Sequence, residues 1–413
     1  MISSKKKCEK MSDKNKRKLF EILICAILAA AVFAGLALSG YVAKNVDSGA
    51  ATTDPAITEV PTEEDTTKSV SSGPISIVAV GDNLIHNTLV DAGQKEDGTA
   101  DYTSFYKDIK KYISAADIAI INQETMLGGA EFPYAGYPCF NTPWEVGTAA
   151  IDAGFDIFTC ATNHSLDVGF KGIEQERIFF DNHPEVTAVG TYATEEASKK
   201  ITYYEEKGVT FALLNYTYGT NGIPLPQDRE WCVNMMDKDR ITADVNTAKQ
   251  NADVVIVFPH WGVENTTQIS SYQKDYVKLF SDLGVDIVIG CHPHVLQTVE
   301  WVENETTGKR MLVYYSLGNF ISHQTSVDQL CGGMAEITLE KKNDEIIINS
   351  AKLAPIVCWY SKSGSKYSYS VYKLSEYTDS LASSHSQRSK GATPEYYTKH
   401  AKDVIPEEFL DLS

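Results

Sequence analysis

Two histidines one residue apart, His292 and His294, are the residues of this sequence that most directly suggest chemistry. They follow Val285–Ile289, a short apolar run rich in β-branched residues, which is typical of a buried strand. In an extended segment residues i and i+2 point the same way, so both imidazoles can reach one side of a strand end, and Pro293 stiffens the link between them. The pair predicts a metal site, with two surface histidines as the alternative.

The same pattern, an apolar run followed by a cluster of polar residues, occurs four more times earlier in the chain. Carboxylate, amide and imidazole groups at consecutive strand ends are the donors that a hydrolytic site with one or two metal ions requires. Divalent Mn, Zn or Fe accepts such a mixed set, and a carboxylate can bridge two ions. We therefore expect a centre of divalent metal ions, two in number, and the expected ligands are Asp82, Glu124, Asn163, His260, His292 and His294.

Three further residues are expected to take part in catalysis. His164 directly follows Asn163 and would be placed to protonate a leaving group. Asp167 would orient that imidazole, as carboxylates often do. Glu264 is a candidate ligand, base or outer partner of a ligand. Additional candidates for the site are His86, Asn122 and Asn319.

Each of these residues also has a structural interpretation. Asp82 and Asp167 could be turn formers, and Asn163 could cap the helix that follows it. His260 could be a packed core residue, and His86 could lie at the surface. The coincidence of five polar clusters at five strand ends favours a functional site over these separate interpretations.

Strands and helices alternate along the part of the chain that carries the clusters. Strands are predicted at residues 75–80, 118–121, 156–159, 253–258 and 285–289, each directly before one cluster. Helices are predicted at residues 102–115, 144–153, 172–182, 241–251 and 271–283, and a hairpin at residues 201–216. Such alternation predicts a mostly parallel sheet, and the ligands of such sheets gather at the carboxyl ends of the strands.

The pattern changes beyond residue 296, where strands are predicted without intervening helices. These strands cover residues 297–303, 311–315, 334–339, 346–348 and 353–359. Meandering strands that return to a core suggest a second sheet packed face to face on the first. We expect residues 74–360 to form one folded domain. Residues 361–413 are expected to form a peripheral cap, with helices at 374–385 and 394–412.

The first 73 residues have the composition of a membrane anchor with its flanks. Residues 1–18 contain eight Lys or Arg and two Asp or Glu, and residues 19–43 form an apolar run long enough to span a bilayer with some tilt. By the positive-inside rule the basic flank stays in the cytoplasm and the main domain is extracellular. An uncleaved single-pass anchor in the cell membrane is expected, with a cleaved signal peptide as the alternative. Residues 44–73 are expected to be a disordered extracellular linker.

The charge of the chain excludes one class of partner. The net charge is −18, and because residues 1–18 carry +6, the rest of the chain carries −24. A body this acidic has no basic face for a nucleic acid backbone, so we expect no nucleic acid partner. Six cysteines lie beyond the apolar run without a C-x-x-C pair, and their pairing stays open.

Six sequence motifs occur in order between residues 74 and 360. They are Gly81-Asp82; Asn122-x-Glu124; Ala161-Thr162-Asn163-His164-x-x-Asp167-x-Gly169; His260-Trp261-Gly262-x-Glu264; Gly290-x-His292-Pro293-His294-Val295-x-Gln297; and Ser316-Leu317-Gly318-Asn319-Phe320. This set resembles the bacterial CapA family of capsule and poly-γ-glutamate synthesis proteins, which is similar to the calcineurin-like metallophosphatases. The resemblance implies an α/β fold, namely a metallophosphatase-like αββα sandwich of two packed mixed sheets with a dinuclear metal site, preceded by one transmembrane helix.

Three positions depart from the metallophosphatase pattern. Leu84 stands where the first motif has a histidine, and the nearest histidine is His86. Glu124 replaces the usual bridging aspartate, and Ser165 replaces the acid that follows Asn-His. Phosphatase activity therefore does not follow from the resemblance.

Three functions are consistent with these observations. The first is a membrane-anchored CapA-like protein that uses a metal-dependent hydrolase-like site in the assembly, release or export of an extracellular polyanion such as poly-γ-glutamate. The second is a non-catalytic accessory subunit that binds the polymer or holds polymer synthase subunits in the membrane. The third is an extracellular metallophosphoesterase. An acidic domain repels a soluble polyanion at long range, which disfavours tight polymer binding outside the metal pocket.

Overall fold

The computed structural model describes residues 73–413 of the chain. The basic segment (1–18), the expected anchor (19–43) and all but the last residue of the expected linker (44–73) lie outside the described residues. Within residues 73–413, every helix is too short or too polar to cross a bilayer. All six cysteines in this part of the chain are free thiols.

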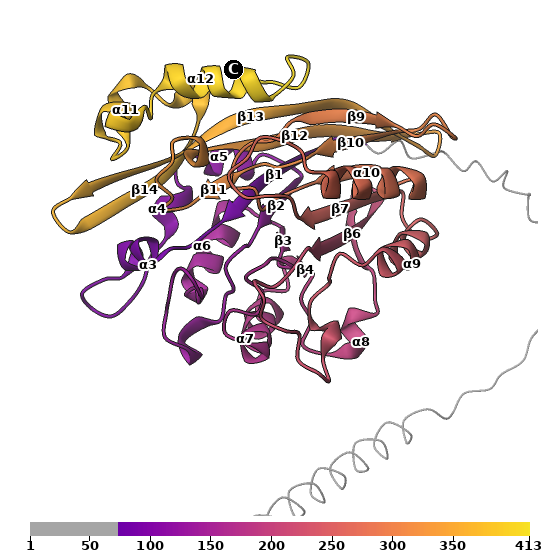
Figure 1. Ribbon diagram of the computed structural model, residues 1–413, viewed down its shortest axis with the longest axis horizontal. Helices are drawn as coiled ribbons and strands as arrows, with labels where there is room; N and C mark the ends of the chain where they lie inside the picture. Colours follow the sequence, from indigo (N-terminus) through magenta and orange to yellow (C-terminus); the bar gives the residue numbers. More distant parts are fainter. Residues whose placement is uncertain (1–72) are drawn as a thin grey trace, which may run out of the picture. The chain divides into compact units, whose positions relative to one another are not determined.

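An eight-stranded mixed sheet forms one half of the described part of the chain (Figure 1). Strands β1 to β4 are parallel neighbours, whereas β12, β13 and β14 extend the sheet antiparallel on the other side of β1. The short strand β11 pairs with β1 in parallel. The bounds are β1 (Ile75–Asn83), β2 (Ile118–Asn122), β3 (Ile157–Thr159), β4 (Thr187–Val189), β11 (Asn319–Ile321), β12 (Cys331–Lys342), β13 (Glu345–Ser363) and β14 (Lys366–Lys373).

A six-stranded mixed sheet forms the other half, in the order β5-β6-β7-β8-β10-β9. The four central strands are parallel, and the antiparallel strands β5 and β9 form the two edges. The bounds are β5 (Thr202–Glu206), β6 (Val209–Thr217), β7 (Val254–His260), β8 (Ile287–Ile289), β9 (Val299–Glu303) and β10 (Arg310–Tyr314).

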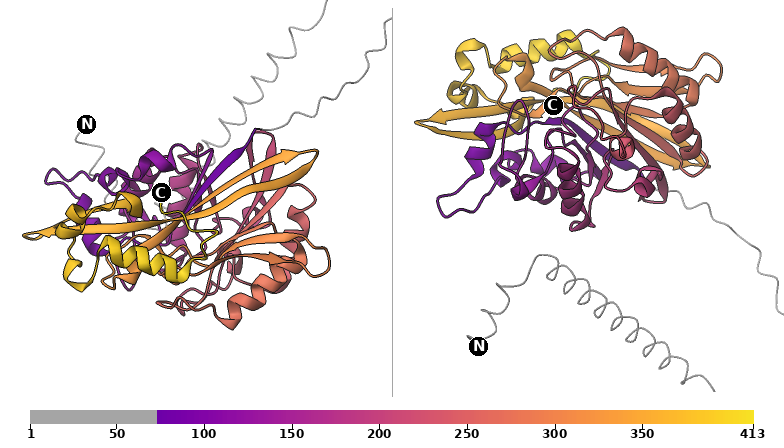
Figure 2. Two further views of the ribbon diagram at one scale, coloured as in Figure 1. Left: turned by 90° about the horizontal axis from the view of Figure 1, so that it is seen from above. Right: turned by 60° about the horizontal axis from the view of Figure 1, so that its bottom comes forward.

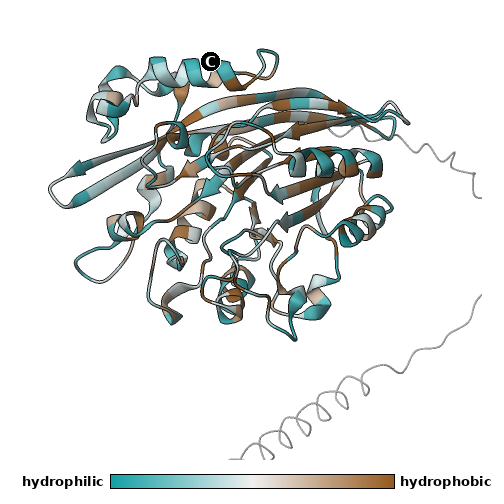
Figure 3. Cartoon of the chain, in the orientation of Figure 1, coloured by the Kyte–Doolittle hydropathy of each residue, from teal (hydrophilic) through white to brown (hydrophobic). Residues whose placement is uncertain are grey.

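The two sheets pack against each other through a shared apolar core. Strand residues alternate between the two faces of a sheet, so every second side chain enters this core. Ala79 and Ile120 of the first sheet and Phe258 and Ile289 of the second line one cavity of about 10 Å³ between the sheets. In Figure 3 the central strands consist mostly of hydrophobic residues, whereas many residues of the helices are hydrophilic.

Helices cover the outer face of each sheet, which completes an αββα arrangement (Figures 1 and 2). Phe158 of β3 faces α7, with its ring centroid 5.2 Å from that of Phe180. Val257 and Val288 of the second sheet pack with buried residues of α9 and α10. The bounds are α3 (Asn87–Gly93), α4 (Thr103–Tyr106), α5 (Lys110–Ile113), α6 (Trp144–Ala153), α7 (Phe170–Asp181), α8 (Glu195–Ser198), α9 (Lys238–Ala248) and α10 (Ser271–Leu283).

The C-terminal residues pack on β13 through two short helices, α11 (Asp379–Ser384) and α12 (Pro394–Val404). Trp359 of β13 donates its indole N–H to the carbonyl of Leu381, at 3.0 Å. The backbone N–H of Leu353 donates to the carbonyl of Phe409, at 2.6 Å. β13 continues to Ser363 and β14 follows it, so the first sheet extends past residue 360, where the sequence predicted the domain to end.

The helix predicted over residues 102–115 is wrong, because the segment forms the two single turns α4 and α5. Phe105 contacts Tyr369 of β14, and Tyr106 stacks on Phe320 of β11. Both rings come from the single turn α4, and the chain leaves the helical path at residues 107–109 before α5 begins. Tertiary packing therefore overrides the helical pattern here.

The predicted composition of the second sheet is also wrong. The strands beyond residue 296 do not form it by themselves: β9 and β10 join it, whereas β11 to β14 join the first sheet. The other members of the second sheet are the hairpin β5-β6 and the strands β7 and β8. The two strands predicted at 346–348 and 353–359 are one strand, and β4, β11 and β14 were not predicted. Periodicity identifies strands but carries no information about the partner of each strand.

Candidate metal centre

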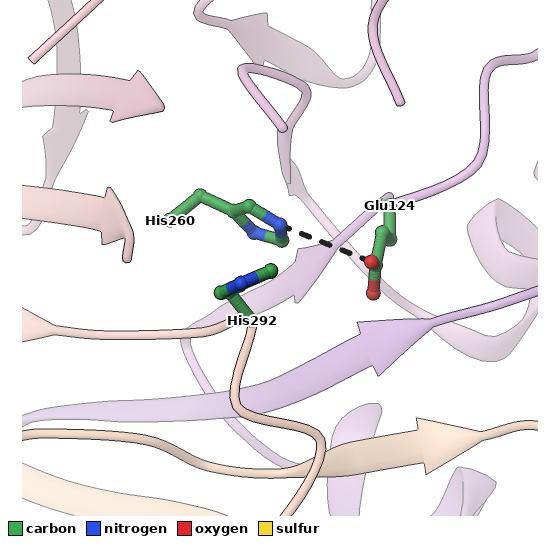
Figure 4. A group of neighbouring side chains, drawn as sticks. All are labelled: Glu124, His260 and His292. Atoms are coloured by element: carbon green, nitrogen blue, oxygen red, sulfur yellow. Dashed lines mark ion pairs between the residues drawn. The ribbon is translucent and has the colours of Figure 1, made fainter. Parts of the chain in front are cut away.

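The polar clusters meet at one edge of the sandwich, where the carboxyl ends of parallel strands from both sheets lie together. Asp82 lies in the last part of β1, Glu124 follows β2, and His260 ends β7. A parallel bridge between His260 and Cys291 places the segment after β8 beside β7. Figure 4 shows the side chains of Glu124, His260 and His292 directed toward one another. The strand ends thus position the side chains as the strand–helix alternation predicts.

Three groups of three side chains each offer ligand atoms that lie within 4.8 Å of one another. The groups are Asp82, Glu124 and His294; Glu124, His260 and His292; and Glu264, His292 and His294. Glu124 belongs to the first two groups, as expected of a carboxylate shared by two neighbouring ions. Asn163 lies beside the second group, because its Oδ1 is 2.8 Å from Nε2 of His260. All six expected ligands are therefore neighbours in the structure.

The carboxylate of Glu124 is buried without a hydrogen bond from the part of the chain that the structure describes. Glu124 is 1% exposed, and no described residue donates a hydrogen bond to either of its carboxylate oxygens. Oε1 lies 3.8 Å from Nε2 of His260, the contact that the dashed line in Figure 4 marks, and 3.7 Å from Nε2 of His294. The Nδ1 atoms of His260 and His292 also lack hydrogen-bond partners within this part of the chain. Because a buried unpaired carboxylate is costly, these orphaned atoms fit a site that binds divalent cations.

Two asparagines hold the ligands of the first group in place. Asn122 donates from Nδ2 to Oδ1 of Asp82, at 2.8 Å. The other carboxylate oxygen of Asp82 lies 2.9 Å from Nδ1 of His294, and Oδ1 of Asn319 lies 3.1 Å from the same nitrogen. The structure therefore places the additional candidates Asn122 and Asn319 as partners of the expected ligands, which is how an outer shell fixes a metal site.

A close approach of two glycines determines the position of Asp82. The backbone N–H of Asp82 donates to the carbonyl of Gly318, at 2.9 Å. A Cβ atom at Gly81 would lie 1.8 Å from that carbonyl oxygen, so only glycine fits at this position. The Gly81-Asp82 motif and the Gly318-Asn319 motif therefore form one structural unit, although they are far apart in the sequence.

The segment after β8 is a tight turn, and the expectation of an extended pair of histidines is wrong. The φ angles of His292 and His294 are 102° and 59°, in the left-handed region that non-glycine residues rarely adopt. Each such residue costs about 1–3 kcal/mol and persists only where the surrounding structure imposes it. Here the backbone N–H of Asn265 donates to the carbonyl of Pro293, at 2.8 Å, and pins the turn. The turn, rather than a strand, directs both imidazoles into the centre.

His164 and Asp167 form a hydrogen-bonded pair next to the centre. Nδ1 of His164 lies 2.7 Å from Oδ2 of Asp167, and that oxygen also accepts from the backbone N–H of Phe140, at 2.6 Å. The carboxylate accepts the proton on Nδ1, which leaves Nε2 available to a substrate. Thr162 joins this pair to the centre, because its hydroxyl donates to the carbonyl of Glu124 and accepts from the N–H of His164.

The remaining candidates lie at the margin of the site. Glu264 is exposed and joins the centre only in the group with His292 and His294. His86 is half-buried and outside all three groups, with Nδ1 3.2 Å from the carbonyl oxygen of Leu84. Asn163 does not cap the next helix, since the residue before α7 is Gly169.

Burial and neighbouring charges shift the acid–base behaviour of the centre. Burial, with the charge of Asp82 as the second cause, raises the pKa of the Glu124 carboxyl well above its ordinary value. Burial lowers the pKa of His294, but the charges of Glu124 and Asp82 outweigh burial and raise that pKa to about 10. Burial, followed by the neighbouring imidazoles, lowers the pKa of His260 well below its usual range and that of His292 to about 3. His260 and His292 are therefore neutral, as metal ligands must be.

Sequence reasoning missed three residues that complete the site, all from β6 or the loop after it. Asn215, within β6, accepts from the N–H of Ala161 at 2.6 Å and donates to the carbonyl of Phe258 at 2.8 Å, so it joins the two sheets beneath the centre. Tyr218 and Asn221 contact histidines of the site. A polar residue in an apolar strand and the Asn221-Gly222 turn were the available signals.

A family model described as "Bacterial capsule synthesis protein PGA_cap" matches residues 76–324. Similar curated proteins include the PGA biosynthesis protein CapA of Bacillus subtilis (strain 168), 34% identical, and the capsule biosynthesis protein CapA of Bacillus anthracis, 32% identical, each over 184 residues. These alignments cover 42% and 44% of this chain and 44% and 43% of the relatives. The chain thus spans less than half the length of the curated relatives it matches.

Two solved structures show a weak likeness to the chain. The NAD nucleotidase of Haemophilus influenzae has a TM-score of 0.45 at 13% identity, over 82% of this chain and 64% of that one. The calcineurin-like phosphoesterase YfkN of Bacillus subtilis has a TM-score of 0.38 at 14% identity, over 79% and 99%. At these scores neither likeness carries an argument about the chemistry of this chain.

Proposed function

Because this chain belongs to the bacterial capsule synthesis protein PGA_cap family, we propose that it acts in the synthesis or export of a capsular polymer such as poly-γ-glutamate through a metal-dependent hydrolytic site. The observation that supports the hydrolytic site best is the buried carboxylate of Glu124, which has no hydrogen-bond donor among residues 73–413 and faces the imidazoles of His260 and His294. Burial of an unpaired carboxylate is costly, so a pocket with a purely structural role is not expected to contain one.

The ligand groups divide the centre into two positions. Asp82, Glu124 and His294 would hold one divalent ion, and Glu124, His260 and His292, with Asn163 beside them, would hold the other. Bound divalent ions would supply Lewis acidity and a water of lowered pKa. The donor set of carboxylates and imidazoles suits Mn, Zn or Fe.

The chain contributes a proton donor beside these positions. With Nδ1 of His164 held by Asp167, Nε2 is the nitrogen that would deliver a proton to a leaving oxygen or nitrogen. Phe140 restricts the imidazole further, because the two rings meet edge to face with centroids 4.7 Å apart. Glu264, exposed at the margin, would act as an outer ligand or base.

The membrane topology completes the proposal. Residues 19–43 would anchor the chain in the cell membrane, with residues 1–18 in the cytoplasm and the folded part outside, where capsular polymer is assembled. Polymer synthase subunits and the polyanion itself are the proposed partners. The acidic character of the chain favours contact with the polyanion at the metal centre over contact elsewhere.

The first experiment measures bound metal by elemental mass spectrometry on the full chain, beside His292→Ala and the control His183→Ala. His183 lies outside every ligand group, with Nδ1 2.8 Å from the carbonyl oxygen of Phe179. We expect about two transition-metal ions per chain in the wild type and in the control, and a loss in His292→Ala. Absence of metal from the wild type would contradict the hydrolytic site.

A second experiment separates the hydrolase from an accessory subunit. Phosphoester and γ-glutamyl amide substrates are screened with the metal-loaded protein, and polymer output is measured in cells that carry His164→Ala. The hydrolase requires turnover of one substrate class and reduced polymer output from His164→Ala cells. Unchanged output from these cells, together with a loss of output on deletion of residues 19–43, would favour the accessory role instead.

A further inference from the structure

The loop after β6, residues 218–223, faces the metal centre but supplies none of the expected ligands. Thr220 and Ile223 are joined by a backbone hydrogen bond of 2.9 Å, and the two residues between them, Asn221 and Gly222, have φ angles of 51° and 77°. Positive φ at both central residues is the requirement of a type I′ turn, for which Asn-Gly is the favoured pair. The hydroxyl of Thr220 also donates to the carbonyl of Ile223, at 2.6 Å, which stiffens the turn.

The turn places the amide of Asn221 between two residues of the site. Oδ1 of Asn221 accepts from Nδ2 of Asn163, at 3.2 Å. Its Nδ2 lies 3.3 Å from Nδ1 and 3.5 Å from Nε2 of His164. Since Nδ1 of that imidazole already gives its proton to Asp167, it offers no lone pair to the amide. The lone pair of this tautomer is on Nε2, and the contact from Nδ2 of Asn221 to Nε2 is long, at 3.5 Å. Asn221 is also exposed, so its N–H groups are only weakly held beside that nitrogen.

The aromatic ring of Tyr218 borders the same space. Its centroid is 4.6 Å from that of His292, and the residue is 39% exposed. The backbone N–H of Tyr218 donates to the carbonyl of His260, at 3.0 Å, so the loop is tied to the strand end that carries a ligand. The loop is consequently held beside the centre.

We propose that Asn221 is a substrate-binding residue that donates, together with Nε2 of His164, to an oxyanion of the substrate. This inference rests on the proposed function and deepens it. An anionic group that approaches Asp82, Glu124 and Glu264 meets three carboxylates, so neutral or positive donors beside the centre would favour its binding. The amide of Asn221 is such a donor, and a substrate oxygen would accept a hydrogen bond from its weakly held N–H groups.

The test uses the full chain loaded with Mn²⁺ and inorganic phosphate as the oxyanion probe, with binding measured by titration calorimetry. Asn221→Ala removes the donor, and Asn221→Asp replaces it with a charge that repels the probe. The matched control is Asn343→Asp, since Asn343 also has a φ of 51° in a two-residue turn, between β12 and β13, and lies outside every ligand group. We expect the phosphate Kd to rise about tenfold in Asn221→Ala and further in Asn221→Asp, with no change in the control.

The outcomes distinguish this inference from the function on which it rests. Phosphate bound with equal affinity by the wild type and both Asn221 variants would overturn the role of Asn221 but leave the metal site intact. Loss of metal from the Asn221 variants would also overturn it, because Asn221 would then support the centre rather than the substrate. A wild type that retains metal but binds no phosphate would overturn the inference about Asn221, whereas a wild type without metal would overturn the function on which it rests.

Discussion

The imidazole of His164 and the carboxylate of Asp167 form one unit, with 2.7 Å between Nδ1 and Oδ2. The pair stands three residues apart in the sequence and is nearly closed to solvent, with side-chain exposures of 8% and 1%. The N–H of Phe140 donates to the same carboxylate oxygen. This hydrogen bond fixes the carboxylate, and the carboxylate in turn orients the imidazole.

Replacement of Asp167 by Asn is expected to slow hydrolysis without removing metal. The amide would donate to Nδ1 instead of accepting from it, which removes the charge that stabilises the imidazolium. General acid catalysis contributes about 10²–10⁴-fold, so we expect kcat to fall by about 100-fold or more. Turnover of a substrate found in the screen and metal content by elemental mass spectrometry are measured together, with the exposed Asp181→Asn as control. Unchanged kcat in Asp167→Asn would contradict the role of the pair.

Replacement of Glu124 by Gln is expected to abolish metal binding and, with it, the stabilisation of the protein by metal. No described residue donates a hydrogen bond to the buried carboxylate of Glu124, which belongs to two of the three ligand groups. A neutral amide in its place removes a charged ligand from both positions. Urea unfolding is measured with a chelator and with added metal, which should stabilise the wild type but not the variant. Equal stabilisation of both proteins by metal would contradict the role of Glu124.

Metal binding is expected to release protons near neutral pH. In the metal-free protein burial lowers the pKa of His294, but Glu124 and Asp82 raise it to about 10, so the imidazole is protonated at pH 7. A metal ligand must be deprotonated, and about one proton per chain should therefore leave when the site is filled. The apparent metal affinity should rise with pH up to about 10. Titration calorimetry in buffers of different ionisation enthalpy counts the protons, and a count of zero would refute the assignment.

The stability of the protein is expected to fall in acid through a histidine remote from the centre. Burial lowers the pKa of His385 to about 4, although its hydrogen bond to the Cys358 carbonyl acts in the opposite direction. Nε2 lies 3.2 Å from the Cys358 carbonyl oxygen, and the N–H of Gln387 donates to Nδ1, so the neutral ring is fully paired. Because the folded pKa lies below the ordinary 6.5, the unfolded state takes up the proton first as the pH falls. The stabilisation present above pH 6.5 is then lost between pH 6.5 and 4, by about 3 kcal/mol.

The measurement for His385 compares urea unfolding of the wild type and His385→Gln at pH 7.5 and pH 4, with a chelator present. Glutamine can keep the donor to the Cys358 carbonyl but cannot be protonated, so the variant should lose less stability in acid than the wild type. Both proteins contain His260 and His292, so the contributions of these two histidines to the loss of stability in acid cancel in the comparison. Equal losses in both proteins would contradict the prediction.

The positions of the candidate ligands could be predicted from the sequence because they depend on local patterns. Each apolar strand ends in a glycine or a polar residue, and Asp82, Glu124, Asn163 and His260 follow from that pattern and from the tendency of parallel strands to end at one edge. Helices such as α6 and α10 begin and end where their apolar spacing predicts. These features need no knowledge of distant contacts.

Only the tertiary structure decided how these residues meet. The left-handed backbone at His292 and His294, the contact of Gly81 with Gly318, and the approach of Asn221 to His164 all join segments that are distant in the sequence or bent against local preference. The division of the later strands between the two sheets is of the same kind. Strand periodicity reports which face of a segment is buried, whereas pairing partners and turn strain depend on the free energy of the whole packed chain.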